Sequence, residues 1–161
     1  MGKMIELTAG DGHKLAAYRA DPAGKPRGAV VVIQEIFGVN SHIRSVADGY
    51  AADGYLAIAP ALYDRIERNF EVGYTPDDIA KGRAVKDKVA LDAALKDVQA
   101  AVKAAASAGK VGIVGYFRDQ HRERFQVLDR GPRATTTLHI KDVIKMAPAE
   151  LWGEDFVANV D

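Results

Sequence analysis

The sequence has no cysteine among its 161 residues. This absence excludes disulfide bonds, zinc sites with cysteine ligands, iron–sulfur clusters and a thiolate nucleophile. Histidine is scarce too, with four scattered residues and no His-Glu-x-x-His spacing, so the sequence indicates no metal site. The glycines of the run Gly112–Gly115 lie inside an apolar stretch rather than in a phosphate-binding loop. We therefore expect no cofactor.

Neither sign of charge predominates, because 22 Lys and Arg residues balance 22 Asp and Glu residues. A balanced chain offers no net field that would attract nucleic acid or anionic lipid. Long hydrophobic runs are also missing: the longest, about Tyr55–Leu62, is far shorter than the roughly 20 residues that cross a bilayer. The start of the chain, Met1–Glu6, lacks an apolar signal core. These absences predict a cytoplasmic protein with no nucleic-acid or membrane partner.

What the chain does contain is the pattern of an α/β fold. Two short runs, 4–9 and 13–19, are joined by Gly10-Asp11-Gly12, which predicts an antiparallel hairpin. Continuous apolar runs predict strands buried on both faces. These runs are 29–33, 55–59 and 110–116. Because helical segments separate them, we expect right-handed crossovers and a mostly parallel sheet between two helical layers.

Helix signals occur between the predicted strands. Asn40 or Ser41 can cap a helix that ends near Gly54. Thr75 and Pro76 form a second helix start, and the helical pattern continues to about residue 106, in two pieces.

The composition changes after Tyr116. Residues 1–116 contain 23 alanines, whereas residues 117–161 contain 4 alanines and no serine. We therefore divide the chain into residues 1–116 and a divergent tail, residues 117–161.

Several motifs in the first part occur in an order that resembles one family. They are Gln34-Glu35-Ile36-Phe37-Gly38-Val39-Asn40, His42-Ile43-Arg44, Gly54-Tyr55-Leu56-Ala57-Ile58-Ala59-Pro60, Leu91-Asp92-Ala93-Ala94 and Gly109-Lys110-Val111-Gly112-Ile113-Val114-Gly115-Tyr116. With these motifs, roughly the first 116 residues resemble the dienelactone hydrolase family. The resemblance implies an α/β-hydrolase-like fold that is incomplete here, and hydrolysis of an enol lactone or related ester.

The resemblance also implies site residues. The family's nucleophile is usually a cysteine in Gly-x-Cys-x-Gly, supported by a histidine and an aspartate from later in the chain. A glutamate matched by Glu35 pairs with that cysteine, and the backbone N–H matched by Ile36 helps bind the oxyanion.

The nucleophile position is the point where this sequence departs from the family pattern. Gly115 is present, but Phe117 occupies the nucleophile slot and Asp119 replaces the second glycine. Phenylalanine has no atom that can attack a carbonyl carbon. Asp119 is two positions late for a nucleophile and fits a solvated helix or loop residue better. We therefore predict impaired catalysis.

The remaining candidates have alternative interpretations. Glu35 follows a buried strand and predicts a cleft at the strand's carboxyl end; otherwise it is a rim residue paired with Arg44 or Arg118. Tyr63 is placed in the same cleft. Arg83 can contact a carboxylate substrate, as can Arg118, although an arginine on a helix face is usually solvated.

The later histidines match no family base. His121 lies in a polar segment, 117–124, that is typical of a helix surface, and His139 fits a strand residue that faces water.

The strand at 111–116 needs a neighbour, because an apolar edge strand exposes unpaired backbone groups. We expect residues 134–140 to add a strand and residues 142–146 to form a short helix. Leu151, Trp152 and Phe156 would then seal the core. Alternatively, the exposed edge pairs with a second copy and forms a homodimer.

Three functions follow from this sequence. The first is a dienelactone-hydrolase-like protein, interrupted at the nucleophile turn, that acts on a small-molecule ester or lactone with impaired activity. The others are a noncatalytic binding or interaction module and a truncated gene product without a selected function.

Overall fold

The computed structural model describes residues 1–119 and 122–128, with side chains described through Gly115. In chain order, the elements are β1 (Lys3–Thr8), β2 (Lys14–Ala20), β3 (Ala29–Ile33), α1 (Ser41–Ala52), β4 (Leu56–Pro60), η1 (Leu62–Arg65), α2 (Pro76–Lys86), α3 (Leu91–Ala105), η2 (Ala106–Ala108), β5 (Val111–Asp119) and β6 (Arg122–Leu128).

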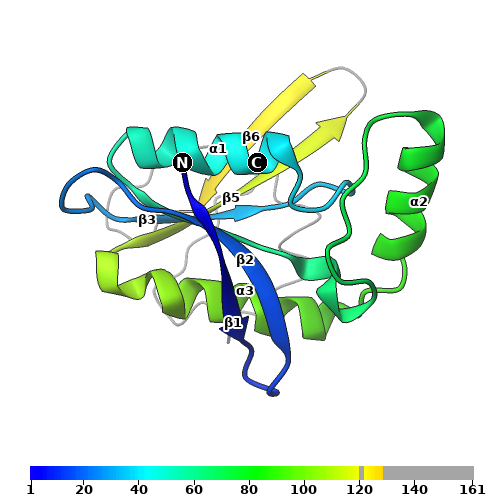
Figure 1. Cartoon of the computed structure of the whole chain (residues 1–161), viewed down its shortest axis with the longest axis horizontal. Coiled ribbons are helices and arrows are strands. Elements are labelled where there is room, and N and C mark those ends of the chain that lie inside the picture. Colours follow the sequence, from blue (N-terminus) through cyan, green and yellow to red (C-terminus); the bar gives the residue numbers. More distant parts are fainter. Residues whose placement is uncertain (120–121, 129–161) are drawn as a thin grey trace.

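The described strands form one mixed sheet in the order β1-β2-β4-β3-β5-β6. β3 is parallel to both β4 and β5, whereas the β1–β2, β2–β4 and β5–β6 pairs are antiparallel. Helix α1 covers one face of the sheet and α3 covers the other (Figure 1). The expected α/β fold with its N-terminal hairpin is confirmed, and the parallel arrangement is confined to the three central strands.

Both faces of the central strands are buried in hydrophobic cores. All five residues of β3 are buried. Successive side chains of a strand point to opposite faces. Accordingly, Val31 packs in the cluster that contains Ala101 of α3, and Val32 packs in the cluster that contains Ile43 of α1. The continuous apolar run of β3 therefore reflects its place between two helical layers.

The helix starts agree with the sequence signals. The side-chain oxygen of Asn40 accepts a hydrogen bond from the Ile43 N–H (3.1 Å) and caps α1. Thr75 and Asp78 form a reciprocal capping box at the start of α2, with Pro76 at its first position. The second helical region is divided as predicted, into α2 and α3.

An ionic cluster joins the β1–β2 loop to α3. Arg65 of η1 donates to both carboxylate oxygens of Asp97 (2.7 and 2.8 Å) and to both of Asp11 (3.0 and 3.1 Å). Asp97 is fully buried, and Arg65 is the cation paired with it. The hydrogen bond from Arg65 lowers the pKa of Asp11 to about 2.

The chain after Tyr116 differs from two expectations. β5 continues as a strand through Asp119, which is neither a helix nor a loop residue, and the predicted polar helix over 117–124 is wrong. β6 pairs antiparallel with β5, from Asp119 opposite Arg122 to Ile113 opposite Leu128. This pairing satisfies the backbone groups on the outer side of β5. β6 therefore occupies the edge position for which we expected residues 134–140.

The other tail predictions lie outside the described residues. They concern the strand at 134–140, the helix at 142–146, the sealing residues Leu151, Trp152 and Phe156, and the histidines His121 and His139. Within the described part of the chain, no helix has the length and apolarity needed to span a membrane.

Candidate functional site

The candidate site lies on the loop that follows β3. Gln34 is buried, and Glu35 and Ile36 are partly buried. Glu35 and Gly38 form an isolated antiparallel bridge, so the chain reverses between them. Gly38 has φ +82°, and a Cβ at this position would overlap the Phe70 carbonyl group. A glycine is therefore required for the turn that presents Glu35 and Ile36.

The side chain of Gln34 ties the start of this loop to η1. Its Oε1 accepts a hydrogen bond from the Leu62 N–H (2.9 Å), and its Nε2 donates to the Glu35 carbonyl oxygen (3.3 Å). Sequence analysis did not single out Gln34. A polar amide directly after five buried apolar residues is the signal that could have identified it, because buried polar groups are normally hydrogen-bonded.

Residues 69–74, which we call the strap, contact the part of the loop after Ile36. The Val72 N–H donates to the Phe37 carbonyl (3.2 Å), and the Tyr74 ring packs edge-on against Phe37, with centroids 4.6 Å apart. The Asn40 side-chain amide donates to the Tyr74 hydroxyl (3.0 Å). These contacts keep the loop in one conformation.

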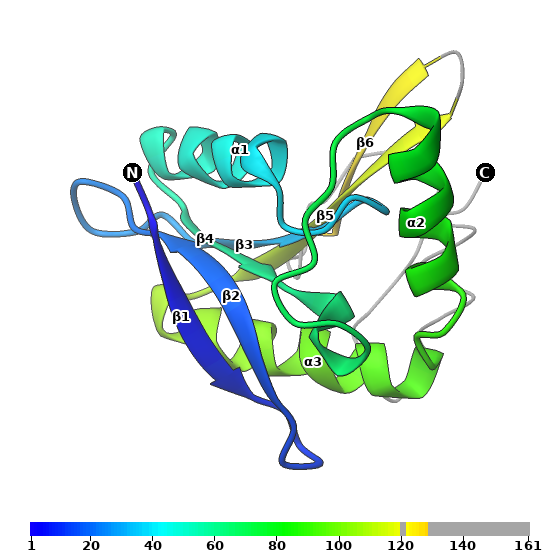
Figure 2. The ribbon, with the colours of Figure 1, turned by 45° about the vertical axis from the view of Figure 1, so that its right-hand side comes forward.

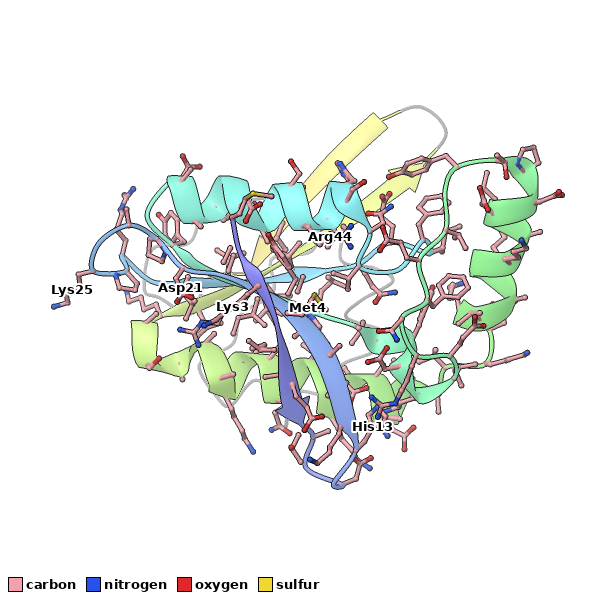
Figure 3. All side chains as sticks on the ribbon, viewed as in Figure 1. Lys3, Met4, His13, Asp21, Lys25 and Arg44 are labelled. Carbon is pink, nitrogen blue, oxygen red and sulfur yellow. The ribbon has the colours of Figure 1, made fainter. Side chains whose placement is uncertain are left out.

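Arg44 is engaged by the strap. Its guanidinium reaches from α1 (Figure 3) and donates to both carboxylate oxygens of Glu71 (2.8 and 3.1 Å) and to the Val39 carbonyl (2.7 Å). The rim interpretation offered Arg44 as a partner of Glu35. The structure gives it Glu71 as its bidentate partner.

Helix α2 packs against the loop from another direction (Figure 2). Gly82 is one of its two buried residues, and a Cβ there would overlap the Ile36 carbonyl oxygen. The helix therefore contacts Ile36 with its backbone. The next residue along the helix, Arg83, is exposed. Sequence analysis did not identify Gly82, because its contact lies 46 residues away along the chain.

Tyr63 lies in η1, directly after the residue whose N–H bonds Gln34. It is buried and packs edge-on against Phe70, with ring centroids 5.5 Å apart. Burial, with a smaller contribution from the negative charge of Asp87, raises the pKa of Tyr63 to about 12. Its hydroxyl therefore stays protonated at neutral pH and is a hydrogen-bond donor.

The nucleophile slot lies on β5, the parallel neighbour of the strand β3 that leads to Glu35. In the parallel pair of β3 and β5, Ile33 lies opposite Gly115. Glu35 and Phe117 each follow this pair by two residues, and the paired register of the two strands ends at the pair. Phe117, however, lies within β5, opposite Arg124 of β6, and Arg118 lies opposite Glu123. The chain does not turn into a helix at this point.

Two histidines, His13 and His42, lie in the described part of the chain. Figure 3 shows His13 at the β1–β2 loop, away from Arg44, and His42 lies on the exposed surface of α1. The described residues contain no group of three or more His, Cys, Asp or Glu side chains that could hold a metal ion.

Comparisons with known proteins agree with this architecture. A candidate carboxymethylenebutenolidase of Synechocystis sp. is 43% identical over 109 residues, which cover 64% of this chain and 44% of that protein. The carboxymethylenebutenolidase of Pseudomonas putida is 36% identical over 118 residues, which cover 70% and 50% of the two chains. The chain thus spans about half the length of these curated relatives.

A solved structure shows the same relationship. The crystal structure of a candidate dienelactone hydrolase from Klebsiella pneumoniae has a TM-score of 0.58 and 32% identity, covering 72% of this chain and 50% of that one. The family model of the dienelactone hydrolase family matches residues 15–117 and ends at the nucleophile slot. This chain therefore belongs to the dienelactone hydrolase family.

Proposed function

We propose that this chain retains the Glu35 carboxylate and the carbonyl-binding N–H of Ile36 from a dienelactone hydrolase site, and lacks the nucleophile. The observation that supports this proposal most directly is the path of β5. The strand runs through Phe117 to Asp119 without a turn. Hydrolysis of enol lactones and related carboxylic esters would then be strongly impaired.

The chemistry of ester cleavage explains the expected loss. Acyl transfer needs an attacking atom, a base that accepts its proton, and donors that stabilise the oxyanion. Phe117 has a hydrocarbon ring in place of the attacking atom, whereas the Ile36 N–H can still donate to a carbonyl oxygen. Knockout of a triad nucleophile typically lowers kcat on the order of a millionfold.

The substrate contacts belong to the same proposal. The protonated hydroxyl of Tyr63 is a donor for a lactone or ester oxygen. Arg83, exposed on the helix that touches Ile36, and Arg118, at the end of β5, are cations for a substrate carboxylate. A small-molecule ester or lactone is therefore the proposed ligand class. We also propose that the protein acts in the cytoplasm.

The test is hydrolysis of p-nitrophenyl acetate and of an enol lactone by the full chain. We expect rates equal to the buffer background, for the wild-type chain and for Glu35→Gln alike. Glu67→Gln, at an exposed glutamate, is the matched control. Turnover that Glu35→Gln abolishes and Glu67→Gln preserves would contradict the proposal.

A second candidate is a noncatalytic binding module. The tight hold on the Glu35 loop by Gln34, the strap and α2 favours it, because a preorganised loop reduces the entropic cost of binding. A lactone that raises the melting temperature without being converted to product would support this function.

A further inference from the structure

The carbonyl groups of Glu35 and Ile36 flank the Ile36 N–H along the chain, and each contacts another part of the fold. The N–H shares one planar peptide group with the Glu35 carbonyl, so the orientation of that carbonyl determines where the N–H points. The Ile36 carbonyl belongs to the next peptide group. When both carbonyls are held, the two backbone dihedrals of Ile36 have little freedom left.

Gln34 holds the first carbonyl. Its side chain is buried, and its two amide atoms have different partners: Oε1 accepts from the Leu62 N–H (2.9 Å) and Nε2 donates to the Glu35 carbonyl (3.3 Å). The Leu62 N–H requires an acceptor, which fixes the amide orientation and directs its NH₂ group toward Glu35.

The backbone of Gly82 packs closely against the second carbonyl. The backbone of α2 approaches the Ile36 carbonyl so closely that a Cβ at position 82 would overlap its oxygen and come within 3.3 Å of the Ile36 Cβ. Most residues of α2 are exposed, and only Gly82 and Val85 are buried. The absence of a side chain at position 82 therefore permits the close contact between α2 and the loop.

We infer that Gln34 and Gly82 are positioning residues that together set the direction of the Ile36 N–H. This inference rests on the proposed function, in which that N–H donates to the carbonyl oxygen of the ligand. Neither residue needs to touch the ligand.

The experiment measures the direction of the N–H bond itself. Residual dipolar couplings of the ¹⁵N-labelled full chain report the orientation of each amide relative to the rest of the molecule. We compare Gln34→Glu, which keeps an acceptor for Leu62 and removes the donor, with Gln99→Glu in α3. We compare Gly82→Ala with Gly49→Ala, because Gly49 is a helical glycine with open space around its Cα.

We expect the Ile36 coupling to change in Gln34→Glu and Gly82→Ala, while the couplings of β3 and β4 in these variants match those of the wild type. In both control variants, the Ile36 coupling should also match the wild type. An Ile36 coupling equal to that of the wild type in either variant would overturn the assignment of that residue. Thermal unfolding is recorded first. If Gln34→Glu is unfolded at the measuring temperature, the uncharged Gln34→Met, which removes both hydrogen bonds, replaces it.

A lactone titration of the same samples separates this inference from the proposed function. A lactone-induced chemical-shift change of the Ile36 amide that is smaller in Gln34→Glu and Gly82→Ala than in the wild type supports the inference and the proposed function. If no lactone shifts the Ile36 amide of the wild-type chain, the carbonyl-binding proposal fails, and the dipolar couplings still decide the positioning roles.

Discussion

At the residue scale, single side chains with buried polar atoms hold this molecule together. Sequence reasoning found the residues that follow a local rule, such as the caps Asn40 and Thr75. It did not find Gln34 or the buried carboxylate of Asp97, because their partners lie 28 and 32 residues away. A local pattern shows that a residue is polar, whereas burial and pairing depend on the whole fold.

Asp11 gives the residue scale a pH test. Its pKa is lowered from 3.8 to about 2 in the folded chain, first through the hydrogen bond from Arg65. A carboxyl group with a depressed folded-state pKa stabilises the fold above its unfolded value, and this stabilisation is lost as the pH falls from about 3.8 through about 2. We expect Asp11→Asn to reduce the fall in urea midpoint across this interval.

The matched control for this pH test is Asp92→Asn, at an exposed position in the first turn of α3. It removes one carboxylate without removing the Asp11–Arg65 contact, so it separates the effect of this contact from that of net charge. An unchanged slope in Asp11→Asn would contradict the assignment of this stabilisation to the Asp11–Arg65 contact.

At the scale of elements, the sequence predicted the hairpin, the three parallel strands and the divided helix, because each has a local period or cap. It failed at the part of β5 beyond Tyr116 and at β6. The segment 117–124 has the local composition of a helix surface, but residues 117–119 extend β5 and residues 122–124 of β6 pair with them. Strand pairing depends on a partner elsewhere in the chain, and the charge pattern does not contain that information.

Gly38→Ala tests the contact between the Glu35 loop and the strap. The positive φ and the overlap with the Phe70 carbonyl should together lower the free energy of unfolding by about 1–3 kcal/mol. Urea denaturation measures this loss. Gly10→Ala is the control, because Gly10 lies in a turn with open space around its Cα and should change stability little. Equal stabilities of the two variants would show that the strap does not constrain position 38.

At the scale of the whole molecule, the sheet determines how copies can associate. Among the described residues, β6 is hydrogen-bonded to another strand on one side only, and the sheet ends there. An edge strand of this kind can pair with a second chain. The sequence predicted a homodimer through an exposed edge at β5. With β6 paired to β5, we now expect β6 to be the strand that pairs with a second copy.

Sedimentation measures this association directly. We expect a species of twice 17.3 kDa, and a shift toward the monomer when Glu123→Lys places a third cation beside Arg122 and Arg124. Glu67→Lys, on the exposed segment before the strap, should leave the mass unchanged. A wild-type chain that sediments at 17.3 kDa at all concentrations would contradict the dimer.

The bridge that Arg65 makes between Asp11 and Asp97 has a consequence for synthesis. All three residues and the strands β1, β2, β3 and β4 are translated before β5. Chains fold from the N-terminus as they leave the ribosome. The nascent polypeptide can thus close its first four strands against α3 once α3 has left the ribosome and before β5 has emerged, whatever sequence follows.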